Sequence, residues 1–314
     1  MKTRTTLAVL ALLTPATLAL ARQDEEALES IEPISMAFDW PADGSVMVES
    51  EVEKKGLVSS QRYALAWEPA EGGSRFSLND FEFLSLEGPG TENPMAKAMA
   101  MRTLELVPDW LVNDEGGWGG TIDFDYEALV EAMTPLPESA SDEAHRVIEQ
   151  TRATMLSPAM RQQTMAGFSA DWSLWVGMWL ELAVPPAGYL FTLDTTLPFM
   201  GLEVHAPVVV ENLRRFEHRG VECVELTYEQ HLAGDAFTEA IEAYMRTAGI
   251  DQMPQGFIES MERTYSIRAI VEPHTLRPHE VWMRMEITLT QGEREQGRLD
   301  TKHMRFDWED LERE

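Results

Sequence analysis

The chain has 314 residues and a formal net charge of −29, with 54 acidic and 25 basic side chains. Nucleic acid and anionic lipid surfaces would repel so acidic a chain, which excludes both as electrostatic partners. A chain of this length can bury a sufficient core without covalent cross-links. Its single cysteine, Cys223, excludes an internal disulfide and a thiolate metal cluster. It lies in a strand-like stretch, which predicts a buried thiol rather than a reactive one.

The first residues have the pattern of a secretory signal peptide. Lys2 and Arg4 precede an apolar run from Leu7 to Leu20, and residues 19–21, Ala-Leu-Ala, supply a small-residue cleavage site. We expect residues 1–21 to be removed, leaving a periplasmic or secreted protein. No later stretch is apolar for long enough to span a bilayer, so we expect no transmembrane span after signal cleavage.

The part of the chain that follows predicts an antiparallel meander and then a shorter hairpin. Apolar and polar residues alternate, with turn residues such as Lys55-Gly56 between the alternating stretches. Residues 95–107 carry both helix and strand signals, and the choice between them stays open. The predicted strands cover residues 45–54, 61–68, 75–86, 109–112 and 118–122.

The middle of the chain predicts helices, because residues with good capping side chains precede each helical stretch. Asp123 or Asp125 can cap a helix that ends near Met133, and Ser141 can cap a helix over residues 142–155. Ser157 followed by a first-turn proline predicts a further helix that runs into residues 171–182. There Trp172, Trp175 and Trp179 have helical spacing and share one stripe.

Strand patterns return after the helices, with one helix expected from Asp235 to Gly249. The predicted fold class is α+β: a large curved antiparallel sheet with a helical middle segment packed on it. Residues 22–314 form a single domain in this interpretation. Two abutting sheet subdomains joined by helices at about residues 123–183 remain an alternative. The later predicted strands cover residues 201–210, 212–218, 221–230, 264–272, 280–290 and 298–308.

The segment RAIVEPHTLRPHEVWMRMEITL, residues 268–289, predicts a strand, a turn of the form x-Pro-x-Thr-Leu-x-Pro, and a second strand. With the general order of strands and helices, this arrangement resembles that of exported bacterial proteins such as the periplasmic lipoprotein carriers. In those carriers a curved sheet like an unclosed barrel wraps apolar cargo. The resemblance therefore implies a curved half-barrel sheet here.

Catalytic motifs are absent from the sequence. It has no G-x-S-x-G elbow, H-E-x-x-H, Walker loop, G-x-G-x-x-G after a strand, or C-x-x-C, which argues against the common hydrolase, zinc-protease, nucleotide-binding and redox classes. The candidate metal ligands are His274, His279, Glu272 and Glu280, which a hairpin turn could bring together. A solvated polar turn explains the same residues with fewer assumptions, so we expect no metal and no cofactor.

The aromatic middle segment has two interpretations. As core, the tryptophan stripe is covered by the sheet. As a site, an adaptable apolar pocket is lined by Trp172, Trp175, Met178, Trp179, Tyr189 and Phe191.

The excess of methionine and aromatic residues favours the pocket, and we therefore expect an exported, non-catalytic binding protein for a hydrophobic ligand or a lipid-bearing partner. The alternatives are a metal-assisted hydrolase that uses the His274/His279 hairpin, and an envelope scaffold or protein-interaction module.

Overall fold

The computed structural model describes residues 34–89, 91, 101–135, 141–180, 182–184, 190–193, 196–199, 202–205, 208–234, 238–239, 260–291 and 294–308. The predicted signal peptide, and all but residues 238–239 of the helix predicted after Asp235, lie outside these ranges. Within them, strands dominate, and most belong to one large antiparallel sheet. The predicted large antiparallel sheet is confirmed, whereas the α+β description fits only roughly because helices are few.

Hydrogen bonds join the strands of the large sheet in the order β6-β5-β4-β3-β2-β15-β14-β13-β12-β11-β8. Two short pairs lie outside it: β1 (Ile34–Ser35) with β7 (Ala183–Val184), and β9 (Thr196–Phe199) with β10 (Leu202–His205). The bounds of the large sheet are β2 (Gly44–Lys54), β3 (Leu57–Ala70), β4 (Gly73–Glu87), β5 (Asp109–Val112), β6 (Trp118–Ile122), β8 (Leu190–Leu193), β11 (Val208–His218), β12 (Val221–Leu232), β13 (Ser260–Val271), β14 (Pro278–Gln291) and β15 (Arg294–Asp307).

The chain divides into two compact units. Unit 1 consists of Met1–Met36, Glu181–Pro273 and Val281–Lys302, and unit 2 consists of Ala37–Leu180, His274–Glu280 and His303–Glu314. Strands β14 and β15 contribute residues to both units. None of the helices within the described ranges is long and apolar enough to cross a bilayer.

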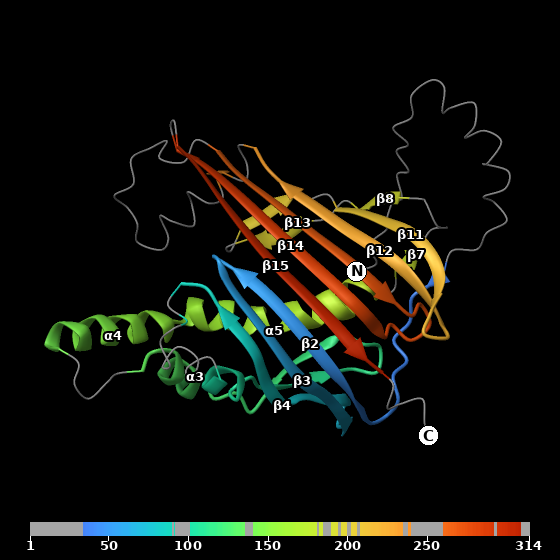
Figure 1. Ribbon diagram of the computed structural model, residues 1–314, viewed down its shortest axis with the longest axis horizontal. Helices are drawn as coiled ribbons and strands as arrows, with labels where there is room; N and C mark the ends of the chain where they lie inside the picture. The colour runs from blue at the N-terminus through green and yellow to red at the C-terminus, as the bar shows by residue number, and fades with distance from the viewer. Residues whose placement is uncertain are drawn as a thin grey trace. The chain divides into compact units, whose positions relative to one another are not determined.

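In unit 2, β2, β3 and β4 lie side by side as the predicted meander (Figure 1). Val46, Val48, Leu65 and Phe76 are buried at alternate positions, which is the pattern of a sheet that packs on one face. The turn between β2 and β3 falls at Lys55-Gly56, where both residues have positive φ and match the twist of the hairpin.

Three helices follow in unit 2, and each begins where its capping residue predicts. Asp125 accepts a hydrogen bond from the backbone of α3 (Tyr126–Met133), Ser141 caps α4 (Asp142–Met155), and Ser157 caps α5 (Pro158–Trp175). These local contacts stabilise each helix by about 1 kcal/mol. For residues 95–107, the described part is helical at 101–104.

The helix that carries the tryptophans is shorter than the spacing of Trp172, Trp175 and Trp179 predicts. Helix α5 ends at Trp175, because Val176 leaves the helical region with φ −129° and ψ −52°. A separate 3₁₀ turn, η1 (Gly177–Trp179), then carries Trp179. Trp172 and Trp175 therefore share one helix, whereas Trp179 reaches the core from the next element.

Unit 1 contains the antiparallel strands β11, β12 and β13 (Figure 1). The turn predicted at Arg219-Gly220 joins β11 to β12, again with positive φ at both residues. A β-bulge lies between Asn212 and Arg214, where the register of β11 shifts by one residue. Because of this shift, the side chains of β11 after the bulge alternate between the two faces of the sheet in the opposite order from those before it.

Candidate functional site

The predicted tryptophans lie in the closed core of unit 2. Trp172, Trp175 and Trp179 are 1%, 1% and 0% exposed. Each indole N–H donates a hydrogen bond: Trp172 to the Gly116 carbonyl oxygen at 2.9 Å, Trp175 to the Met304 sulfur at 3.1 Å, and Trp179 to the Leu174 carbonyl oxygen at 3.3 Å. Buried indoles with satisfied N–H groups are what a stable core requires.

Aromatic rings surround these indoles within unit 2. The ring centroids of Trp172 and Phe76 lie 4.9 Å apart in an edge contact, and those of Trp175 and Phe306 lie 5.5 Å apart. Trp40 also contacts Trp172, at 5.8 Å. Such contacts fit the core interpretation of the stripe, and a ligand pocket lined by these residues stays a prediction.

The remaining predicted pocket residues contribute little to this picture. Met178 is half-buried in η1. Tyr189 lies outside the described residues. The backbone of Phe191 belongs to β8 and pairs with Val210 of β11 in unit 1, whereas the three tryptophans belong to unit 2.

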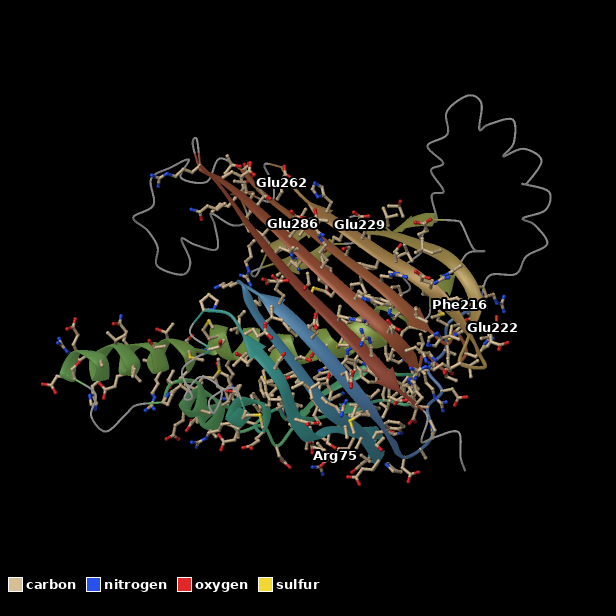
Figure 2. The ribbon with its side chains drawn as sticks, in the orientation of Figure 1. Arg75, Phe216, Glu222, Glu229, Glu262 and Glu286 are labelled. Atoms are coloured by element: carbon tan, nitrogen blue, oxygen red, sulfur yellow. The ribbon has the colours of Figure 1, made fainter. Side chains whose placement is uncertain are left out.

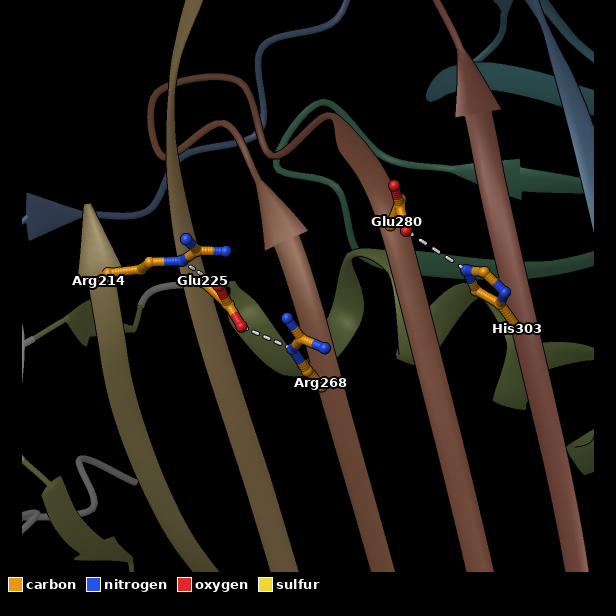
Figure 3. A network of polar contacts seen from close by, with 5 residues as sticks. All are labelled: Arg214, Glu225, Arg268, Glu280 and His303. Atoms are coloured by element: carbon orange, nitrogen blue, oxygen red, sulfur yellow. Dashed lines mark hydrogen bonds and ion pairs between the residues drawn. The ribbon is translucent and has the colours of Figure 1, made fainter. Parts of the chain in front are cut away.

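The candidate metal ligands do not form a cluster. His274 is exposed in the turn before β14, whereas His279 is buried and Glu280 lies 3.4 Å from the Nε2 atom of His303 (Figure 3). The charge of Glu272 contributes to a raised pKa at Cys223. Within the described ranges, no three His, Cys, Asp or Glu residues are placed to hold a metal ion.

Unit 1 has a polar outer face, which we define by Arg214, Glu225 and Arg268 (Figure 3). Glu225 on β12 is buried and accepts hydrogen bonds from Arg214 on β11 and from Arg268 on β13, the latter at 2.6 Å. The two guanidinium groups also stack on aromatic rings, Arg214 on Phe216 and Arg268 on Trp282, each at 4.5 Å. This arrangement is a ladder of charges and rings across neighbouring strands.

The charge of Glu225 is stabilised by its two partners. Burial alone would raise the pKa of Glu225, but the hydrogen bonds and charges of Arg268 and Arg214 outweigh burial and leave the pKa below its ordinary value. The outer face carries further acids that are exposed, namely Glu229, Glu262 and Glu286 (Figure 2). It is therefore an acidic face that is exposed at these three positions and buried at Glu225.

The inner face of unit 1 is the opposite side of the same strands and is apolar. Directly opposite residues share a face, and successive residues alternate between faces, so the pairing of β12 with β11 and with β13 assigns each side chain to a face. On β14, Trp282 lies on the outer face, which places Val281 and its alternate residues on the inner face. The inner face carries Val208, Val210, Val224, Leu226, Leu232, Ile267, Ala269, Val271, Val281, Met283, Met285, Ile287 and Leu289.

Burial changes along this inner face. Val224, Leu226, Ala269, Val271 and Val281 have no exposed surface. At the other end of β14, the inner side chains from Met283 to Leu289 are half-buried. Among the apolar inner side chains, the incomplete covering is therefore confined to β14, because Val208 and Leu232 at the same end of β11 and β12 are buried.

Polar side chains such as Asn212, which stands opposite Leu226, interrupt the inner face, and we call four of the others the polar cluster: Tyr228, Gln230, Arg263 and Tyr265. Gln230 stands opposite Tyr265, and Arg263 stands one inner-face position further along β13. The Arg263 guanidinium carbon lies 5.3 Å from the Tyr265 ring centroid, and the two tyrosine rings meet edge to face at 6.4 Å. The cluster is thus one contiguous group on two neighbouring strands.

Burial perturbs the titratable members of the cluster. It lowers the pKa of Arg263, although the nearby Tyr265 and Tyr228 oppose that shift. Burial also raises the pKa of Tyr228, while the positive charge of Arg263 opposes the rise. Both shifts indicate a site that is largely shielded from water.

The sequence predicts the strands of the polar cluster but not the cluster itself. Residues 221–230 and 264–272 are predicted as strands, and Arg263 precedes the second range by one residue. Pairing Gln230 with Tyr265 requires the register of β12 against β13, which no local motif encodes. The signal in the sequence is a pair of polar residues at alternate positions of an otherwise apolar strand pattern. It occurs twice, at Tyr228 and Gln230 and at Arg263 and Tyr265.

No protein-family model and no curated protein matches this sequence.

Proposed function

We propose that this chain is an exported, non-catalytic binding protein for a hydrophobic ligand or a lipid-bearing partner, and that the ligand occupies the inner face of unit 1. The observation that supports the proposal is the composition of that face, where β11, β12, β13 and β14 all contribute apolar side chains. On β14 the inner side chain of Val281 is fully buried, whereas those from Met283 to Leu289 are half-buried. This half-buried stretch is the part of the face that a ligand can reach.

Burial of apolar surface can supply the binding energy by itself. Each methylene group moved from water into such a face contributes about 0.8 kcal/mol. A ligand with a long alkyl chain therefore gains enough to offset the loss of its free motion on binding. The proposal includes the curved half-barrel sheet implied by the carrier resemblance, since a concave face surrounds an elongated chain on more sides than a flat one.

The half-buried methionines of the inner face fit this role. Met283 and Met285 lie on β14 among the apolar side chains. Methionine has an unbranched, flexible side chain, so it can adapt its shape to ligands that differ in detail. A binding face of this kind selects for apolar character more than for one chemical structure.

Native mass spectrometry after gentle purification tests the proposal. We expect part of the protein to carry an added mass that organic extraction removes, and the extracted protein to enhance the fluorescence of the apolar dye N-phenyl-1-naphthylamine. A protein that carries no added mass and leaves the dye unchanged would overturn the proposal.

Two neighbouring positions on β14 provide a matched pair of variants. Ile287→Glu places a charge on the inner face, whereas Thr288→Glu places the same charge on the outer face. We expect Ile287→Glu to weaken dye binding at least about tenfold, because a carboxylate is costly in an apolar contact, and Thr288→Glu to bind like the original protein. Circular dichroism confirms that both variants are folded. Equal dye binding by the two variants would place the ligand elsewhere.

A further inference from the structure

We infer that the polar cluster recognises the acidic head group of an amphiphile whose apolar tail lies on the inner face of unit 1. This inference rests on the proposed function, because it assigns the tail to the same face, and it adds the chemical class of the ligand. Tyr228, Gln230, Arg263 and Tyr265 supply the donors. A carboxylate or a phosphate is the group that such donors bind together.

Two members of the cluster have donors without an acceptor. Gln230 is 2% exposed, and its Nε2 amide group has no hydrogen-bond partner within the described part of the chain. The buried Nε atom of Arg263 also has none among these residues. Leaving a buried donor unsatisfied destabilises a protein, so two neighbouring ones indicate that an acceptor binds there.

Arg263 differs from the other arginines of unit 1 in its surroundings. The groups that act on its charge among the described residues are the two tyrosines, Tyr228 and Tyr265, and no carboxylate. This is unexpected in a chain with 54 acids and 25 bases. Elsewhere in unit 1, arginines pair with acids, as seen for Arg214–Glu225, Arg215–Glu222, Arg268–Glu225, Arg284–Glu286 and Arg298–Asp300.

The position of the cluster fits an acidic head group attached to a tail. Tyr228 and Gln230 follow Val224 and Leu226 along the inner face of β12. Val224 and Leu226 are fully buried, so an alkyl chain lying along the strands would contact the half-buried inner side chains of β14, from Met283 to Leu289, while its head group meets Arg263. Arginine and tyrosine donors around a desolvated anion form stronger hydrogen bonds than the same groups in water.

Titration of the purified, lipid-free chain with matched twelve-carbon compounds tests the inference. The compounds are dodecanol below its solubility limit and dodecanoate and dodecyl phosphate below their micelle concentrations, with acetate and inorganic phosphate as head groups without a tail. We expect an acidic compound to bind roughly tenfold or more tightly than dodecanol, which is the gain from one or more charge-assisted hydrogen bonds. The tighter of dodecanoate and dodecyl phosphate identifies the head group.

Three variants test whether Arg263 causes the preference for acidic compounds over dodecanol. Arg263→Gln is expected to abolish the difference between the acidic compound and dodecanol while leaving dodecanol binding unchanged. Arg284→Gln removes an outer-face arginine of the same unit and is expected to keep the full preference. Arg263→Lys retains a charge but not the planar donor set, so we expect an intermediate preference.

The outcomes separate this inference from the proposed function. If dodecanol binds and neither acidic compound binds more tightly, the inference is overturned and the proposed function stands. If no tailed compound binds, both fail. A preference that survives Arg263→Gln, or acetate or phosphate binding as tightly as the tailed compounds, also overturns the inference.

Discussion

The indole N–H of Trp172 donates a 2.9 Å hydrogen bond to the carbonyl oxygen of Gly116, which joins helix α5 to the β5–β6 hairpin in the core of unit 2. Gly116 adopts φ +84°, a conformation that favours glycine. A Cβ atom at this position would lie 2.7 Å from Phe38 and 2.9 Å from Leu180. The close packing of the aromatic core therefore depends on the indole of Trp172 and on the absence of a side chain at Gly116.

Replacing Gly116 with alanine should destabilise the protein through strain and overpacking together. We expect Gly116→Ala to lower the free energy of unfolding by about 2–4 kcal/mol. Gly56→Ala is the matched control, because Gly56 also has positive φ, at +75°, but a Cβ atom there meets nothing within 4 Å. The control should cost only about 1–2 kcal/mol of backbone strain. If urea denaturation shows that the two variants lose the same free energy of unfolding, the core adapts to the methyl group added at Gly116.

The ladder on the outer face predicts a pH-dependent contribution to stability. The pKa of Glu225 is lower in the folded state than in the unfolded state, so its contribution is complete above about pH 4.5 and is lost as pH falls through the folded pKa. We expect Glu225→Gln to cost about 1–2 kcal/mol at pH 7, since both arginine partners are about half exposed.

The stability cost of Glu225→Gln should shrink below pH 4.5, because the original glutamate becomes protonated there, first in the unfolded state and at lower pH in the folded state. Glu229→Gln, on the same strand and face but exposed, should change stability by less than about 0.5 kcal/mol at either pH. Urea denaturation at pH 7 and pH 3.5 checks both statements. A cost for Glu225→Gln that is the same at the two pH values would contradict the role assigned to its charge.

The lone thiol should be inert in the folded protein. Cys223 has no exposed surface, and burial, together with the negative charges of Glu272 and Glu222, raises its pKa to about 12. Only the thiolate reacts, so we expect modification by Ellman's reagent at pH 8 to be more than about a hundredfold slower in the native protein than in denaturant. Rapid modification without denaturant would show that β12 opens readily.

Arg263 and Arg268 lie on the same strand but on opposite faces, and they should respond in opposite ways to loss of charge. Arg263→Met removes a largely buried charge that has no carboxylate partner among the described residues, so we expect the ligand-free protein to gain about 1–2 kcal/mol. Arg268→Met breaks the pair with Glu225 and should destabilise. Urea denaturation compares the two. A loss of stability in both variants would indicate a structural role for Arg263.

Local signals predicted much of the fold. The side chains of Asp125, Ser141 and Ser157 cap their own helices, so each helix start could be located from neighbouring residues alone. Alternating patterns likewise located most of the long strands, although they divided β11 (Val208–His218) near residue 211 and did not predict β8 or β9. Cys223 was correctly predicted as buried. The end of α5 was missed, because the spacing of Trp179 suits a helix although the backbone at Val176 does not continue it.

The polar cluster could not be predicted for a different reason. Gln230 and Arg263 are far apart in sequence, and only the pairing of β12 with β13 places them on one face. If β12 and β13 paired one residue out of register, Tyr228 and Gln230 would lie on one face of the sheet and Arg263 and Tyr265 on the other. Side-chain chemistry that depends on such pairing is visible only in the folded chain.

Hydrogen exchange with and without bound dodecanol tests the central claim most directly. If the ligand lies on the inner face of unit 1, protection should increase in β11, β12, β13 and the β14 residues after Val281, and it should leave α5 and its tryptophans unchanged. Protection confined to α5 and η1, or no change in any strand of unit 1, would contradict the account.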